Sequence, residues 1–178
     1  MRFEETSIPG VYVIDHFHAT DARGDFTKVF HTPSFKERGM DFKLEESYYS
    51  ISKKNVIRGM HFQTPPHDHE KIVFVSRGSI TDVVLDLRKD STTYKQYLTV
   101  DLSASNTKGI YIPKGCAHGF LSLEEDTCAV YMVSTAYAPE ADAGIRYDTF
   151  NYDWVVNKPI ISERDLKFPD MESFESPF

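Results

Sequence analysis

The stretch that decides the fold runs from Asn55 to Gly78 and reads NVIRGMHFQTPPHDHEKIVFVSRG. It sets an arginine, three histidines and a lysine between two apolar runs. The second run, residues 72–75 (IVFV), is apolar and β-branched, which is typical of a buried strand. Ionisable groups therefore lie at the mouth of a β-framework, where desolvation makes them costly. A chain built only for stability would avoid that cost, so we interpret the stretch as the floor of an active site.

The composition indicates a globular protein with an acidic balance. The chain has 178 residues, of which 40% are hydrophobic and 13% aromatic. This length is enough to bury a core, and aromatic residues favour the half-buried surfaces of sheets. The net charge is -7, which argues against a nucleic-acid-binding protein. An anionic small ligand is still compatible with this charge, because a few arginines can reverse the field inside a pocket.

Several features predict a soluble, cytoplasmic protein with no membrane partner. The first ten residues lack the basic and apolar regions of a signal peptide. No apolar run approaches the roughly 20 residues that span a bilayer. Cys116 and Cys128 lie in apolar, strand-like surroundings without metal-type spacing, so we expect buried free thiols in a reducing compartment.

Short strand candidates follow one another along most of the chain. They lie at 11–14, 25–31, 44–52, 72–75, 80–87, 94–102, 109–113 and 128–135, with a loop at 113–120 that leads into another strand. Turns that recur about every 8 to 12 residues favour a β-sandwich or barrel over βαβ units. A helical segment is predicted at 33–39, and the chain becomes irregular from about 138, with room for a short helix within 162–178. Without repeats or linkers, residues 1–178 are expected to form one all-β domain with a few short helices.

His61 is the leading candidate for a catalytic base. A lone histidine is more often a hydrogen-bonded structural residue, but Arg58 and Lys71 lie close to this one in the sequence. Neighbouring cations would lower the pKa of His61 and keep it neutral near pH 7.

A metal site is the alternative use of the histidines. His67 and His69 could chelate a metal together with His118 if all three lay on strands. The pair follows two prolines, however, and the carboxylate expected a few residues later is missing. We therefore expect no metal, and a metal-dependent isomerase or oxygenase remains the first alternative.

Five further residues have both an ordinary and a functional interpretation. Tyr131 lies in an alternating strand and is either a core residue or an acid, and Tyr137 lies at the end of that strand. Asp165 fits the start of a helix, and Arg23 fits a turn. His118 is either packed in the core or directed into a barrel.

Taken together, these segments resemble the dTDP-4-dehydrorhamnose 3,5-epimerase family from about Ile8 to Asp165. The resemblance rests on residues 58–63 (RGMHFQ), Lys71 ten residues after the histidine, residues 112–120 (IPKGCAHGF), Tyr131, residues 23–26 (RGDF) and Ser162-x-x-Asp165. It implies a cupin-type jelly roll, usually a homodimer, that acts on a nucleotide-linked 4-keto-6-deoxy sugar without a metal.

The resemblance also implies a role for individual residues. His61 would be the base, oriented by Asp165; Lys71 would stabilise an enolate oxygen, and Tyr131 would be the acid on the opposite face. Arg23 and Arg58 would hold the diphosphate, with Phe26 near the nucleobase. The other substrate-binding candidates are Lys28, Glu46, Tyr48, Gln63, His118 and Tyr137.

Elementary chemistry supports these roles independently. A proton next to a ketone can be removed only if a positive donor holds the developing enolate. Inversion needs a base on one face of the sugar and an acid on the other. Because no hydride or electron leaves the substrate, no cofactor is required.

The chain departs from the family where the substrate would be recognised. Glu46 and Tyr48 stand where a Q-x-N pair is common, Lys28 where a glutamate is common, and residues 147–150 (YDTF) replace a W-N-D-P run. We therefore hypothesise an epimerase whose nucleotide or sugar differs from dTDP-4-keto-6-deoxyglucose, or which inverts one carbon only. A non-enzymatic sugar-binding jelly roll is the second alternative.

Overall fold

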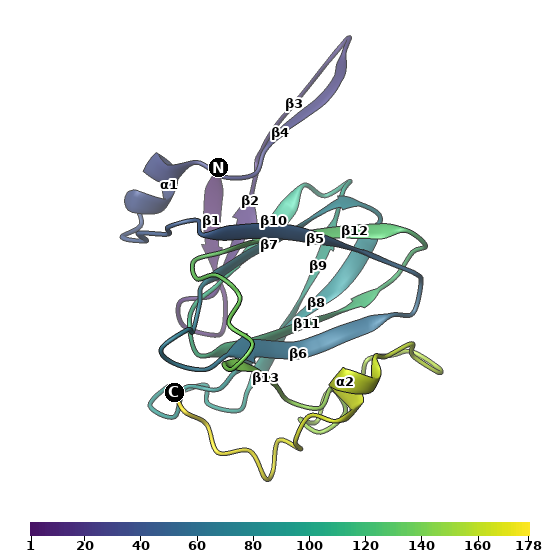
Figure 1. The fold of residues 1–178 in the computed structure, drawn as a ribbon. Helices are drawn as coiled ribbons and strands as arrows, with labels where there is room; N and C mark the ends of the chain where they lie inside the picture. Colours follow the sequence, from purple (N-terminus) through teal and green to yellow (C-terminus); the bar gives the residue numbers. More distant parts are fainter.

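Two facing antiparallel sheets form the body of the protein, seen edge-on in Figure 1 in a computed structural model that describes residues 1–178. The six-stranded sheet contains β1 (Arg2–Glu5), β2 (Tyr12–Asp15), β10 (Lys108–Ile112), β7 (Lys71–Arg77), β12 (Thr127–Val133) and β5 (Glu46–Ser52), in that order. The five-stranded sheet contains β13 (Asp142–Gly144), β6 (Ile57–Gln63), β11 (Cys116–Ser122), β8 (Ser79–Asp86) and β9 (Tyr97–Ser103). This is the architecture of a cupin-type jelly roll, as the sequence predicted.

The first core cluster fills the space between the sheets. Val73 and Ile110 from one sheet pack with Val84, Leu102 and Phe120 from the other. Alternation along each strand supplies this layer, because every second side chain points inward. The inner layer is thus apolar where these residues meet, and polar groups replace it toward one end of the sandwich.

Two further clusters cover the outer faces of the sheets. Phe62 and Leu85 on the five-stranded sheet pack under Trp154 and Met171 from the C-terminal segment, which runs along that face in Figure 1. The outer face of the six-stranded sheet is covered by the segment around α1 (Thr32–Lys36), through Phe35 and other apolar residues. Strand β8 is therefore buried on both faces along most of its length.

A two-stranded hairpin stands away from the body. It is formed by β3 (Phe17–Asp21) and β4 (Gly24–Lys28), and Figure 1 shows it projecting past the edge of the sandwich. All five residues of β3 are exposed, so the hairpin buries little against its own chain.

Some elements differ from the sequence-based predictions. The predicted loop at 113–120 is strand β11 from Cys116 onward, because both of its neighbours in the sheet pair with it. Arg58 and Gly59 lie inside strand β6. Gly59 is required there, because a Cβ atom would lie 2.5 Å from Gly119 Cα on the neighbouring strand. Strands β1, β3, β6 and β13 were not predicted, whereas the short C-terminal helix, α2 (Glu163–Leu166), was.

Candidate active site

A cavity of about 270 Å³ opens between the two sheets at their polar end. Strands β6 and β11 of one sheet contribute His61 and His118, whereas β7 and β12 of the other sheet contribute Lys71 and Tyr131. It joins a larger cavity of about 390 Å³, which His61 and Lys71 also line. The imidazole and the phenol therefore enter one space from opposite walls.

His61 is held by the carboxylate of Asp165. The distance from His61 Nε2 to Asp165 Oδ1 is 2.9 Å, which assigns the ring proton to Nε2 and leaves the lone pair on Nδ1. Burial, the largest effect, lowers the pKa of His61; the Asp165 hydrogen bond and charge oppose it, while Lys71 and Arg164 add to it. The ring is thus poised as a neutral base near pH 7.

Helix α2 delivers Asp165 to the site. Its N-cap Ser162 accepts a hydrogen bond from the Asp165 backbone N–H, at 3.1 Å. The Gly59 N–H donates to Asp165 Oδ2 over 3.2 Å, which ties the carboxylate to β6. Burial alone would raise the pKa of Asp165, but the hydrogen bonds and charge of its partners hold that pKa below its usual value. The carboxylate therefore stays ionised beside His61.

Lys71 lies at the start of β7, almost fully buried. Its side chain makes one hydrogen bond within the chain, from Nζ to the His61 carbonyl oxygen at 3.2 Å. Burial lowers the pKa of Lys71 to about 8, with Asp82 and Asp142 opposing that shift. The ammonium therefore remains charged at neutral pH and keeps donors free for an anionic oxygen.

Tyr131 lies in the middle of β12, under the ring of Tyr48. The two rings stack with centroids 4.8 Å apart and an interplanar angle of 20°. The nearest hydroxyl, Ser50 Oγ, is 3.4 Å from Tyr131 Oη, too long for a strong hydrogen bond. Burial raises the pKa of Tyr131, so the phenol keeps its proton. A protonated phenol with a weak partner can act as an acid toward a bound ligand.

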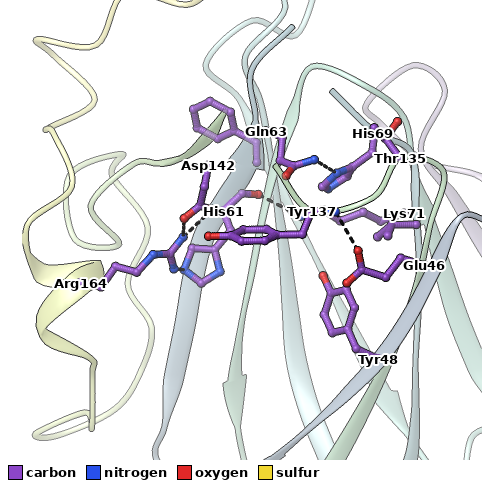
Figure 2. Close-up of a pocket in the computed structure, with 12 residues that line it drawn as sticks. Glu46, Tyr48, His61, Gln63, His69, Lys71, Thr135, Tyr137, Asp142 and Arg164 are labelled. Atoms are coloured by element: carbon purple, nitrogen blue, oxygen red, sulfur yellow. Dashed lines mark hydrogen bonds and ion pairs between the residues drawn. The ribbon is translucent and has the colours of Figure 1, made fainter. Parts of the chain in front are cut away.

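Glu46 and Tyr137 line the larger cavity, whereas Arg58 lines the smaller one. Glu46 Oε2 accepts a hydrogen bond of 2.7 Å from the Tyr137 backbone N–H, and Figure 2 shows the Tyr137 ring extending across the opening. Arg58 lines the smaller cavity, where its Nε donates to Ser52 Oγ over 3.0 Å. The carboxylate of Glu46 is thus bonded to the backbone of Tyr137, and both residues are substrate-binding candidates.

Gln63 is engaged with its own chain. Its amide nitrogen donates to the His67 carbonyl oxygen at 2.8 Å and to His69 Nδ1 at 3.0 Å, and its Oε1 accepts from the Ala138 N–H at 2.7 Å. These bonds assign the His69 proton to Nε2, and burial, with nearby cations, lowers the pKa of His69 to about 3. Gln63 therefore organises the loop that follows β6, although it also lines the larger cavity.

The histidines that could have formed a metal site are used in other ways. No group of three or more His, Cys, Asp and Glu side chains converges in a geometry that could hold a metal ion. His118 Nε2 instead lies 2.7 Å from Asp82 Oδ2, at the base of the smaller cavity. His67 and His69 lie in the loop between β6 and β7.

Comparisons with known proteins identify the family of this chain. The family model for dTDP-4-dehydrorhamnose 3,5-epimerase matches residues 5–173. The protein of that name from Methanothermobacter thermautotrophicus is 40% identical, with 92% of this chain and 91% of the relative covered. The chain belongs to the dTDP-4-dehydrorhamnose 3,5-epimerase family. It is therefore an isomerase of the epimerase class.

Solved structures of other epimerases superimpose closely on this one. The Bacillus anthracis dTDP-4-dehydrorhamnose 3,5-epimerase with TDP and PPi bound gives a TM-score of 0.92 at 33% identity, covering 96% of this chain and 99% of the other. ChmJ, a 3'-monoepimerase from Streptomyces bikiniensis in complex with dTDP-quinovose, gives 0.90 at 28% identity, covering 94% and 87%. Enzymes that differ in the number of centres they invert thus have the same fold.

The hairpin residues of this epimerase lie away from its own cavity. Arg23 is exposed and paired with Asp21 at 2.6 Å, Phe26 is 58% exposed, and Lys28 Nζ lies 5.9 Å from the centre of the Phe17 ring. None of the three lines a cavity with His61. Their contact with substrate stays a prediction.

Two side chains of the epimerase site escaped the sequence analysis. Arg164 and Asp142 line the larger cavity beside His61, and their ion pair is drawn in Figure 2. Arg164 directly precedes Asp165, which was the one signal available in the sequence. Asp142 lies on β13, a three-residue strand in a region predicted to be irregular.

Proposed function

We propose that this epimerase inverts one or both of the carbons that flank the ketone of a nucleotide-diphosphate-linked 4-keto-6-deoxy sugar. His61 Nδ1 removes the proton next to the ketone, and the C–H electron pair moves onto the carbonyl oxygen. The Lys71 ammonium stabilises the resulting enolate, since it is a buried positive donor beside the base. The Tyr131 hydroxyl then returns a proton to the same carbon from the opposite face.

Proton balance requires the enzyme to be reset after each inversion. The reaction leaves an imidazolium at His61 and a phenolate at Tyr131, and exchange with solvent restores both groups. No electron or hydride leaves the substrate, so the step needs no redox partner. C3 and C5 both lie next to the C4 carbonyl, so the same lysine can stabilise either enolate.

One observation carries the proposal. His61 and Tyr131 line a single cavity from opposite sheets, and Lys71 lines it with them. A sugar-binding module has no need of a base and an acid on facing walls, and the pKa directions of the two groups suit those roles.

The test is hydrogen exchange in D2O with dTDP-, UDP-, GDP- and CDP-linked 4-keto-6-deoxy sugars. The proposal predicts deuterium at C3, C5 or both in at least one of them, together with inverted product. His61→Asn should lower exchange by about 10²- to 10⁴-fold while leaving the fold intact. Absence of exchange with every sugar in a folded preparation would contradict the assignment.

The same panel addresses the identity of the substrate. Glu46 places a carboxylate at the mouth, and Tyr48 lies over Tyr131, where the family commonly has a Q-x-N pair. We infer that the preferred nucleotide or sugar differs from dTDP-4-keto-6-deoxyglucose. Deuterium at C3 alone would indicate a monoepimerase, which is what the name of ChmJ states for that relative. A preference for the dTDP sugar with exchange at both carbons would contradict this inference.

We further propose that residues 1–178 act as one domain in a homodimer. The exposed hairpin supports the dimer, because Arg23 and Phe26 could reach the cavity of a second copy although they do not reach their own. Arg58, Arg23 and Phe26 would then bind the nucleotide diphosphate together. The free thiols of Cys116 and Cys128 are compatible with a cytoplasmic enzyme. None of the helices is long and apolar enough to span a bilayer.

A further inference from the structure

Arg164 lies at the centre of an ion-pair cluster beside His61. Its Nη2 atom is 2.6 Å and 2.5 Å from the two carboxylate oxygens of Asp142. Its Nη1 atom is 3.2 Å from Asp165 Oδ1 and 3.1 Å from His61 Nε2. The guanidinium also lies 4.9 Å from the centre of the Phe168 ring. Figure 2 shows Arg164 and Asp142 meeting directly next to His61.

Asp165 Oδ1 accepts two donors. One is the His61 Nε2–H at 2.9 Å, and the other is an Arg164 Nη1–H. Because the Nε2 position carries a proton, the short contact between Nη1 and Nε2 joins two donors and is unfavourable by itself. It persists because both donors bind the same oxygen and Asp142 holds the other end of the guanidinium. The negative charge of Asp165 is therefore shared between Arg164 and His61, so it stabilises a positive charge on His61 less than it would alone.

The charges around His61 balance when the imidazole is neutral. Asp165 and Asp142 contribute two negative charges, and Arg164 and Lys71 contribute two positive ones. The remaining titratable or charged groups that line the two cavities are Glu46, Tyr48, Arg58, His69, His118, Tyr131 and Tyr137, with Asp82 behind His118. A proton on His61 would add a third positive charge beside those of Arg164 and Lys71.

We propose that Arg164 is a positioning residue, which keeps His61 in its neutral Nε2–H form with Nδ1 free by sharing the Asp165 carboxylate and supplying an adjacent positive charge. The inference rests on the proposed function, because it makes His61 the base. A carboxylate alone would hold the imidazole in place but would also favour its protonated, inactive form. Arg164 separates these two effects, since it preserves the orientation while opposing the charge.

The lowered pKa of His61 agrees with this arrangement. Burial is the largest cause of its lowering, Asp165 works in the opposite direction, and the Lys71 and Arg164 charges lower it further. Removal of the guanidinium therefore leaves Asp165 less opposed, so the pKa of His61 should rise.

The test compares charge-removing and charge-keeping variants by NMR titration of the free enzyme, with the His61 signal identified by its absence in His61→Asn. Arg164→Met should move the His61 titration midpoint upward by about half a pH unit, and the acid limb of kcat/KM with it. Arg164→Lys should stay closer to the parent enzyme, because the charge remains. Asp142→Asn should move the midpoint in the opposite direction, since it removes a negative charge.

Arg146→Met is the matched control. Arg146 pairs with Asp148 and Asp170 on the C-terminal part of the chain and lines no cavity with His61. Its removal should change neither the titration nor the acid limb. An unshifted His61 midpoint in a folded Arg164→Met variant would overturn the proposal, and so would equal shifts in the Met and Lys variants.

The proposal and the function it rests on fail in different experiments. The titration needs no substrate, so it reports on Arg164 even if no sugar exchanges deuterium. Exchange that persists alongside an unshifted midpoint would instead reject only the role of Arg164.

Discussion

Burial acts on the three central ionisable groups in different directions. It lowers the pKa of His61 and Lys71, because it penalises their charged forms, and it raises the pKa of Tyr131, because it penalises the phenolate. At neutral pH one cavity therefore contains a neutral base, a cation and a neutral acid. These are the protonation states that the proposed reaction requires.

The basic limb of the pH–activity profile should come from Lys71. Its pKa of about 8 means that the ammonium is lost as the pH rises through that value. The enolate then loses its positive donor, so kcat/KM should fall above about pH 8. Lys71→Met should cost about 10²- to 10³-fold in kcat at pH 7. A profile that stays flat to pH 9.5 would contradict the role of Lys71.

Tyr131→Phe should separate proton removal from proton return. The variant keeps the ring that stacks with Tyr48 but lacks the hydroxyl. His61 can still remove and restore the proton on its own face, so loss of deuterium from labelled substrate should continue. Product formation should fall by about 10²- to 10⁴-fold. If washout and turnover fall equally in D2O, the two-face assignment is wrong.

At the scale of elements, the site depends on the position of the shortest helix. Helix α2 has four residues, too few to be stable alone, and it is fixed by contacts at both ends. Ser162 caps its start, and Asp165 reaches β6. Phe168, just after it, packs so closely on Gly144 that a Cβ at that glycine would collide with the ring. The site thus depends on the docking of a very small element.

Ser162→Ala should weaken that docking. Loss of an N-cap costs about 1 kcal/mol, and in so short a helix the cost falls directly on the position of Asp165. We expect roughly a fivefold loss of kcat and faster hydrogen exchange of the Asp165 amide, with little change elsewhere. Ser162→Asp keeps a capping oxygen and should retain most of the activity. Equal activity in the Ala and Asp variants would show that the cap is dispensable.

At the scale of the whole molecule, the hairpin is the feature that one copy does not explain. Strands β3 and β4 carry Arg23 and Phe26 beyond the edge of the sandwich, where they bury little (Figure 1). Exposed aromatic side chains such as Phe17 and Phe26 on a projecting element are typical of an interface.

Mixing two inactive variants tests whether the hairpin serves a second copy. If it does, a heterodimer of Arg23→Ala and His61→Asn contains one intact site, formed by the His61 of one chain and the Arg23 of the other. Activity should then reappear after the subunits are exchanged, to at most about half the parent value per heterodimer. Each variant alone, taken through the same exchange, is the control. No recovery despite demonstrated heterodimers would mean that each hairpin serves its own chain.

The stability of the whole molecule should fall in mild acid because of His16. This residue is 8% exposed, and its Nε2 atom has no hydrogen-bond partner. Burial is the main reason that the pKa of His16 is lowered from 6.5 to about 4, with Asp15 opposing the shift. Between these values the unfolded chain binds a proton that the folded chain does not, so stability is lost as the pH falls.

The His16 effect can be measured by denaturant unfolding at several pH values. Its full size is on the order of 3 kcal/mol and is reached near pH 4. His16→Phe should keep the ring that packs on Phe74 but flatten this part of the profile. Near pH 8 His16 is neutral in both the folded and the unfolded state. The free energy of unfolding of the parent protein and of His16→Phe should then change with pH at the same rate. If the free energy of unfolding of His16→Phe falls between pH 6.5 and pH 4 as steeply as that of the parent protein, the prediction is wrong.

The sequence by itself determined the all-β class, the family and the strands at Lys71 and Tyr131, because strand alternation and motif spacing are local properties of a chain. Only the tertiary structure decided what meets at the site. Arg164 lies 103 positions from His61 and 22 from Asp142, and no local pattern joins them. These residues meet because β13 and α2 pack against β6, where a buried charge needs a partner of opposite sign. The position of the hairpin away from its own cavity is likewise known only from the tertiary structure. The packing of the strands, and not the spacing of residues in the sequence, decides which surfaces one copy can bury.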